Sequence, residues 1–235
     1  MYFEERELKP YAEPVSTSEL REGTTYFAVN YVPGDMLIPI METLVFIGRN
    51  LDIGDVGKVY FQDVRSYRQG IRHDTDPSDE GYASDVNAEI FCGPENQVSH
   101  IFEYEQALDN LIKCSLRRMK LDTERLVRFE GRELKPYAEP TSVADLKQGS
   151  VYFAVTFVDE DMLIPVLETI VFVGRDLEPG DVGKVYFRNA RSSPDAVDSE
   201  NEWDYTAFEN NINHVFEFEG ALDQLLACSL RRRKE

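Results

Sequence analysis

The chain of 235 residues lacks most of the features by which a sequence indicates an activity. It has three cysteines, Cys92, Cys114 and Cys228, without C-x-x-C spacing, so no disulfide framework is predicted. The motifs of phosphate-binding loops, dinucleotide-binding turns, nucleophile elbows and H-E-x-x-H metal sites are missing too. We therefore predict no cofactor, and no catalytic residue follows from a motif.

Long hydrophobic runs are also lacking. The longest, residues 36–47, is interrupted by Pro39, Glu42 and Thr43 and is too short to cross a bilayer. Residues 1–5 contain no basic segment and no apolar core, so no signal peptide is predicted. Together with the few cysteines, these features lead us to expect a cytoplasmic protein that does not engage a membrane.

Positive charge is scarce. The chain has 25 Lys and Arg against 44 Asp and Glu, a formal net charge of −19. A charge of this sign repels phosphate backbones, so we expect no nucleic-acid partner, and a basic protein partner fits better. The hydrophobic fraction of 42%, with 14 Phe and 12 Tyr, is enough to build folded cores.

What the chain does contain is a long internal repeat. Residues 6–14 recur unchanged as residues 132–140, at an offset of 126. Of the 62 positions from Arg6 to Tyr67, 39 are identical at this offset. Residues 100–118 match residues 214–232 at an offset of 114, so the second copy is 12 residues shorter (126 − 114). A repeat of this length predicts two whole small domains rather than a solenoid.

We place the first copy at residues 1–120 and the second at residues 127–235, with a short linker over residues 121–126. Because the linker is short, the copies should lie close together, packed with approximate two-fold symmetry through matching surfaces. The expected result is a monomer of pseudo-dimeric architecture or a homo-oligomer. Each copy should have its own core, since differences such as Leu44 against Ile170 exchange one apolar residue for another.

The pattern within each copy predicts an α+β fold, in which an antiparallel sheet of about four to six strands is covered by one C-terminal α-helix. Alternating aromatic and β-branched residues predict strands over residues 24–32 and 58–64. Residues 36–49 predict two strand pieces with Pro39 at a bend or an edge between them, because proline cannot donate to a ladder. Gly48 is expected to end the second piece.

Helical spacing of apolar residues predicts a helix over residues 107–118, whereas residues 98–105 fit a helix or a strand. Cys114 and Cys228 lie at matching positions of the two predicted helices. No base or orienting group follows from the sequence around them, so we interpret both as small buried residues.

Two acidic segments, residues 73–97 and 192–211, contain no Lys or Arg. Acidic residues mixed with aromatic ones suit a surface that captures a basic protein, because electrostatic attraction raises the association rate. The alternative is a pair of solvated loops. The candidate partner-binding residues are Tyr82, Phe91, Trp203, Tyr205 and Phe208.

His100 and His214 are candidates for a metal or catalytic site. Each is followed three residues later by a glutamate, Glu103 or Glu217, a spacing that places both side chains on one face of a helix. Two ligands do not make a metal site, and a surface or capping histidine is the alternative. We therefore predict no metal.

Glu42 and Glu168 stand out because each lies within an apolar stretch, where an unpaired carboxylate would be costly. We expect each to point outward or to pair with an arginine of its own copy. These arginines are Arg49 or Arg65 for Glu42 and Arg175 or Arg191 for Glu168. General acid–base chemistry is the alternative role.

Three functions are compatible with these features. The leading one is a non-enzymatic, inhibitor-like or immunity-like protein that engages a basic protein through its acidic segments. The second is an enzyme or a ligand- or metal-binding protein with a site between the copies, which requires Glu42, Glu168, His100 and His214 to converge on one cleft. The third is a structural subunit that assembles through exposed sheet edges.

Overall fold

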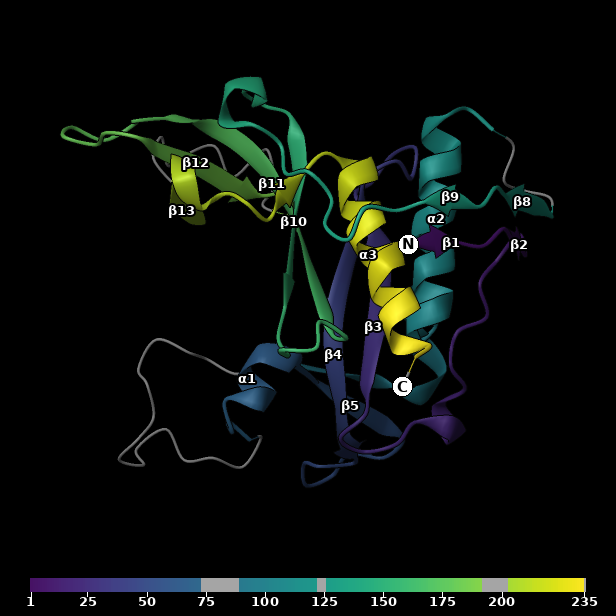
Figure 1. Ribbon diagram of the computed structural model, residues 1–235. Coiled ribbons are helices and arrows are strands. Elements are labelled where there is room, and N and C mark those ends of the chain that lie inside the picture. Colours follow the sequence, from purple (N-terminus) through teal and green to yellow (C-terminus); the bar gives the residue numbers. More distant parts are fainter. Residues whose placement is uncertain (73–88, 122–125, 192–202, 235) are drawn as a thin grey trace.

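A ten-stranded antiparallel sheet organises the molecule (Figure 1). The structure, a computed structural model, describes residues 1–72, 89–121, 126–191 and 203–234. All strand pairings in these ranges are antiparallel, and three α-helices accompany them. The α+β class is therefore confirmed.

Five strands of the sheet come from each half of the chain. In the first half they are arranged in the order β6-β5-β4-β3-β7. Their bounds are β3 Thr25–Tyr31, β4 Pro39–Arg49, β5 Lys58–Asp63, β6 Ile90–Pro94 and β7 Ile101–Phe102. The second half follows the order β13-β12-β11-β10-β14, with β10 Val151–Phe157, β11 Pro165–Arg175, β12 Lys184–Asn189, β13 Tyr205–Phe208 and β14 Val215–Phe216. The predicted strands over residues 24–32 and 58–64 are thus confirmed to within one residue at each end.

The two sets of strands join where β4 meets β11, with Met41 opposite Leu167. Buried hydroxyls reinforce this junction from both sides. Thr43 donates to the carbonyl of Pro165, and Thr169 donates to the carbonyl of Pro39. The junction of the two halves is therefore formed by the long strands β4 and β11 and by the hydrogen bonds between them.

Two details of the predicted strands were wrong. Residues 39–49 form one continuous strand with Pro39 as its first residue, so Pro39 does not lie at a bend or an edge between two pieces. Proline is tolerated as a first strand residue because its missing N–H lies at the end of the ladder. Gly48 lies inside the strand, where the register with β5 shifts between Phe46 and Gly48, so it marks a β-bulge rather than the strand end.

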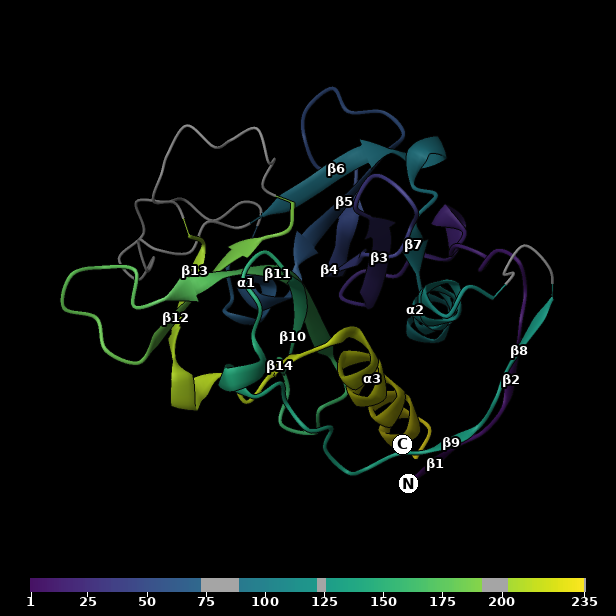
Figure 2. The same cartoon turned by 90° about the horizontal axis from the view of Figure 1, so that it is seen from above.

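Two long helices lie side by side on one face of the sheet, α2 over Tyr104–Arg118 and α3 over Phe218–Arg232 (Figures 1 and 2). The short helix α1, Val64–Arg68, lies on the other side, near the junction of β4 and β11 (Figure 2). No helix in the described ranges is long and apolar enough to cross a membrane. The predicted helix over residues 107–118 is confirmed, and the ambiguous residues just before it include the strand β7.

Short strands near the start of each half form an outer arm beside the helices. β1, Tyr2–Phe3, pairs with β9, Arg132–Glu133, and β2, Arg6–Leu8, pairs with β8, Val127–Phe129. The opening strands of one half thus pair with the opening strands of the other. Four single-turn 3-10 helices complete the described elements: Thr17–Glu19, Glu95–Gln97, Val143–Asp145 and Glu209–Asn211.

The hydrophobic residues form three clusters, and the largest draws on both halves. It contains the inner faces of α2 and α3 together with the helix-facing sides of β3 and β10, such as Phe27 and Phe153. The two smaller clusters lie on the opposite face of the sheet, around Phe61 in the first half and Phe187 in the second. The expectation that each half encloses its own core under its own helix therefore fails for the helix layer, where the halves share one interior.

Candidate functional site

A groove of about 810 Å³ crosses the junction of β4 and β11. Its walls come from both halves, including α1 and the end of β5 on one side and β12 and β13 on the other. Thr43 and Thr169 lie at its floor, fixed by their bonds across the junction. The position of the groove thus follows from the pairing of the two central strands.

Two ion pairs in the groove connect the halves. Glu42 on β4 binds Arg191, which follows β12, and Glu168 on β11 binds Arg65 of α1 at 2.5 Å. The expectation that each glutamate pairs with an arginine of its own half was wrong. The join of β4 to β11 brings Arg191 to Glu42 in place of Arg49 or Arg65, and Arg65 to Glu168 in place of Arg175 or Arg191. Arg49 instead binds Glu95 at 2.5 Å.

Local structure holds both arginines at the groove. Asp63 caps α1 by accepting a hydrogen bond from the Ser66 amide, which sets the position of the first turn that carries Arg65. The Arg65 guanidinium also donates to the Thr156 hydroxyl at 3.1 Å. The main-chain amide of Arg191 donates to the side chain of Asn189 at 2.9 Å. Both guanidiniums therefore reach the groove from short, well-defined turns.

Carboxylates outnumber the cationic groups along the groove. Two guanidiniums line it, from Arg65 and Arg191, together with one imidazole. The carboxylates that line it are Glu42, Asp63, Glu89, Glu168 and Asp204. The groove therefore carries an excess of negative charge within a molecule of formal net charge −19.

His214 is the imidazole that lines the groove, and its Nε2 lies 3.1 Å from the Tyr205 hydroxyl. Burial lowers the pKa of His214 below that of a free histidine, the nearby Glu168 opposes this effect, and Arg65 adds to it. Burial also raises the pKa of Tyr205, with Glu168 contributing in the same direction. Neutral imidazole and phenol are therefore the favoured forms at this end of the groove.

Three of the four acid–base candidates meet in the groove, namely Glu42, Glu168 and His214. His100 is exposed and lies just before β7, outside the residues that line the groove. The helical spacing proposed for each histidine and its glutamate was wrong. Glu103 and Glu217 are the N-caps of α2 and α3, and His100 and His214 precede the strands β7 and β14. No group of three or more potential ligands gathers around a metal position in the described ranges.

The aromatic candidates are distributed differently. Phe91 and Tyr205 lie in the edge strands β6 and β13, half-buried, and both line the groove. Trp203 packs edge-on against Tyr186, and Phe208 is exposed. Tyr82 lies outside the described residues. The segments interpreted as loops therefore include two strands, and the repeat positions of Phe91 and Tyr205 bring both to one surface.

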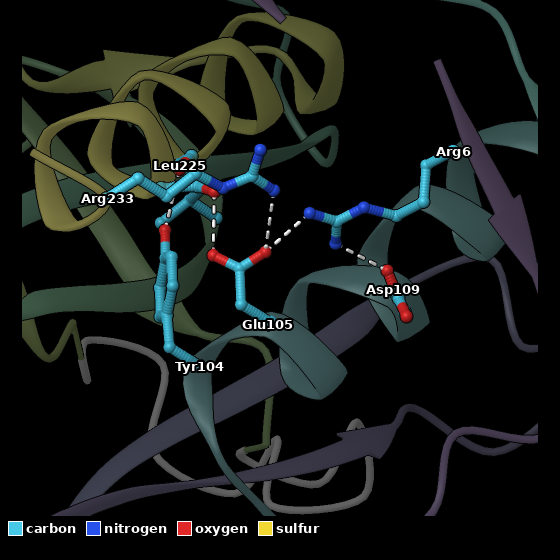
Figure 3. Close-up of polar contacts among 7 residues, drawn as sticks. Arg6, Tyr104, Glu105, Asp109, Leu225 and Arg233 are labelled. Atoms are coloured by element: carbon cyan, nitrogen blue, oxygen red, sulfur yellow. Dashed lines mark hydrogen bonds and ion pairs between the residues drawn. The ribbon is translucent and has the colours of Figure 1, made fainter. Parts of the chain in front are cut away.

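A second polar cluster lies between α2 and α3 (Figure 3). The carboxylate of Glu105 accepts hydrogen bonds from Arg6 at 2.5 Å, Ser229 at 2.7 Å and Arg233 at 3.2 Å. Burial alone would raise the pKa of Glu105, but the hydrogen bonds from Ser229 and Arg6 lower it below its usual range. Arg6 extends the cluster by binding Asp109 at 2.7 Å.

The same arrangement recurs at matched positions, where Glu219 accepts from Ser115 and Arg132. Tyr104 adds a buried bond from its hydroxyl to the carbonyl of Leu225 on the facing helix (Figure 3). In this cluster, donors from both halves already surround the glutamates. Its role is therefore to join the helices, and the groove is the better candidate for binding.

No family model matches the chain, and no curated protein or solved structure is significantly similar to it. The function must therefore be argued from the residues of the groove themselves.

Proposed function

We propose that the protein is a non-enzymatic binding protein whose groove takes a basic segment of a protein partner. One observation carries the proposal: five carboxylates and two guanidiniums line one groove across the junction of the halves. Negative potential concentrated in a concave surface attracts cationic chains and raises their association rate. Phe91 and Tyr205 add half-buried aromatic surface against which the stems of Lys and Arg can pack.

The acidic segments of the sequence continue from the walls of this groove. Residues 73–88 contain five acids and no Lys or Arg, and they lead directly into Glu89, which lines the groove. Residues 192–202 contain four acids and no Lys or Arg, and they connect Arg191 to Trp203. In the sequence, both acidic segments therefore adjoin residues that line the groove, Glu89 and Arg191.

We also infer that the halves are duplicated units packed about an approximate two-fold axis near Met41 and Leu167. Reciprocal contacts support this inference. Thr43 and Thr169 each donate a hydrogen bond to a matching proline carbonyl of the opposite half. Glu42 and Glu168 likewise bind matching arginines of the opposite half. We propose boundaries at residues 1–120 and 127–235. Light scattering should give the mass of one chain, and the mass of two or more chains would indicate a homo-oligomer instead.

A defined basic peptide tests the binding function. Fluorescence anisotropy of a labelled peptide of alternating Lys and Arg should show binding at low salt that weakens steeply as salt is added. Glu42→Gln combined with Glu168→Gln should weaken binding by about tenfold, because two groove carboxylates are lost. The matched control combines Glu13→Gln with Glu139→Gln, at exposed repeat positions outside the groove, where the same charge change should matter far less.

Two results would overturn the proposal. One is a wild-type protein that does not bind the peptide at low salt. The other is equal weakening by the groove and control variants, which would show that only total charge matters. Circular dichroism of each variant establishes that loss of binding is not loss of fold.

A second candidate is a small-ligand or catalytic site in the same groove, favoured by the approach of Tyr205 to His214 at 3.1 Å. It predicts that His214→Ala abolishes stabilisation by a small ligand in a thermal-shift screen, whereas Glu13→Gln preserves it. A screen in which no small molecule shifts the melting temperature of the wild type would count against this second candidate. We further propose a reducing compartment, the cytoplasm, because all three cysteines are free.

A further inference from the structure

The glutamates of the groove already hold guanidinium groups, and those groups come from the chain itself. Arg65 lies on Glu168 and Arg191 lies on Glu42, each across the junction of the halves. The side chains of Arg65 and Arg191 remain 46% and 43% exposed, and those of Glu168 and Glu42 are 38% and 21% exposed. Exposed ion pairs of this kind contribute little to stability, because solvent screens them and because ordering a long side chain costs entropy. A partner that displaces an arginine therefore breaks one partly exposed ion pair and, for Arg65, the hydrogen bond to Thr156 as well.

Each of these ion pairs is also made through a single hydrogen bond among the described residues, from one guanidinium nitrogen to one carboxylate oxygen. The second oxygen of each glutamate accepts no hydrogen bond from the described chain. A guanidinium that approaches in the plane of the carboxylate can bind both oxygens at once, which is stronger than a single bond. An incoming arginine thus has an available geometry that Arg65 and Arg191 do not use.

We infer that Arg65 and Arg191 are internal substitutes for the arginines of a basic partner segment, which displaces them from Glu168 and Glu42 when it enters the groove. The inference rests on the proposed binding function and specifies its partner as an arginine-rich rather than a lysine-rich chain. Lysine is a point charge and cannot match the planar, two-bond geometry. The two internal arginines therefore indicate the preferred ligand. They also weaken its binding, because they compete with it for the same carboxylates.

The test compares the anisotropy of labelled oligo-arginine and oligo-lysine peptides of equal length. The wild type should bind oligo-arginine several-fold more tightly. Arg65→Gln combined with Arg191→Gln should tighten oligo-arginine binding by about tenfold, since each released carboxylate contributes about threefold. The matched control combines Arg49→Gln with Arg175→Gln, which removes the same charge from arginines bound to Glu95 and Glu209, away from the groove.

A second variant guards against long-range charge effects and misfolding. Arg65→Lys combined with Arg191→Lys keeps the net charge and should still tighten oligo-arginine binding, because lysine competes less well for the carboxylates. Equal tightening by the control variant at Arg49 and Arg175, or unchanged binding after either substitution in the groove, would overturn the inference.

Failure of the binding function gives a different result from failure of this inference. If the function is wrong, oligo-arginine binds neither the wild type nor the groove variants, or binds without dependence on Glu42 and Glu168. If only the displacement of arginines is wrong, binding depends on both glutamates but does not respond to changes at Arg65 and Arg191. If the partner chemistry is wrong, oligo-lysine binds as tightly as oligo-arginine.

Discussion

Thr43 of one half donates its hydroxyl hydrogen to the carbonyl oxygen of Pro165 in the other half, at 2.6 Å. The reciprocal bond runs from Thr169 to Pro39 at 2.7 Å. Both threonines are buried, with 5% and 4% of their surfaces exposed. The junction that forms the floor of the groove is therefore held by two buried polar contacts between the halves.

Substitution of Thr43 by valine should lower the free energy of unfolding by about 1–3 kcal/mol, because the Pro165 carbonyl loses its donor while buried. Thr169→Val should have a similar effect. Urea denaturation followed by circular dichroism measures both. Thr206→Val is the control, since Thr206 is exposed on β13 and its substitution should change stability by less than about 0.5 kcal/mol. A change at Thr43 no larger than that of the control would show that the junction bond contributes nothing.

Regular elements were predictable because their patterns are local. The alternation around Phe27 and Val29 predicts a strand, and the apolar spacing from Leu108 to Ile112 predicts a helix, without reference to distant residues. Core positions followed from the differences between halves, since Leu44 and its counterpart Ile170 are both buried. For these elements, the repeat provided a second independent example of each pattern.

The partners of the groove residues were not predictable, because they depend on how the halves join. Glu42 has Arg49 and Arg65 nearer in sequence, yet its partner is Arg191, 149 residues away. The charge pattern of the sequence does not show which of Arg49, Arg65 and Arg191 is the partner of Glu42. The choice is made by the register of β4 against β11, which places Met41 opposite Leu167.

The short helix α1 was missed, although a signal for it was present. Asp63 stands directly before Val64, and its carboxylate accepts from the Ser66 amide three residues later, as an N-cap does. Five residues provide too few apolar positions for a helical period, so the sequence of this segment carries no helical pattern. The cap was the only local evidence for the turn that carries Arg65.

Gly48 and Gly174 are matched positions that allow backbone strain to be measured. Gly48 has φ of +145°, whereas Gly174 lies outside the left-handed region, and a Cβ at either site would meet the following leucine side chain at 2.8 or 2.9 Å. The steric crowding around an added Cβ is therefore similar at the two positions, whereas the backbone conformation differs. Gly48→Ala should destabilise the protein by about 1–2 kcal/mol more than Gly174→Ala in urea denaturation. Equal losses would assign the cost to the leucine contact alone.

Lys113 is a buried amine on α2 whose Nζ has no hydrogen-bond partner in the described chain. Burial lowers its pKa below that of a free lysine, Asp109 opposes the change, and Arg117 adds to it. The matched residue on α3 is Ala227. Lys113→Met keeps the aliphatic stem and removes the charge, so it should raise the free energy of unfolding by about 1 kcal/mol at neutral pH.

The pH dependence of this gain follows from the lowered pKa. Below the folded-state pKa, Lys113 is charged in both states and the full cost of burial is present. As pH rises from that value to the ordinary lysine pKa, the folded state releases its proton first and the cost disappears. The advantage of Lys113→Met should therefore shrink in alkaline solution. Lys9→Met, at an exposed lysine, is the control, and a constant difference across pH would contradict the explanation.

His214 should make the protein less stable in acidic solution. Because burial lowers the pKa of His214 in the folded state, the unfolded chain binds its proton more readily, and stability falls as pH drops through the ordinary histidine range toward the lowered pKa. Above the ordinary pKa the residue is neutral in both states and has no effect. His214→Gln should flatten the stability profile over this window, as measured by thermal melts. His100→Gln, at the exposed matched position, should leave the slope in place.

The three cysteines should differ in reactivity according to burial. Burial raises the pKa of Cys114 to about 12 and that of Cys228 to about 11, whereas Cys92 is exposed on β6. The thiolate is the reactive form, so the two buried thiols should react with a chromogenic disulfide at least about a hundredfold more slowly than an ordinary exposed thiol. Titration of the native protein should therefore count one fast thiol, and titration in denaturant should count all three. Cys92→Ser should remove the fast phase entirely. Rapid reaction of a second thiol in the native state would mean that α2 or α3 opens from the shared core, which the contacts between the helices argue against.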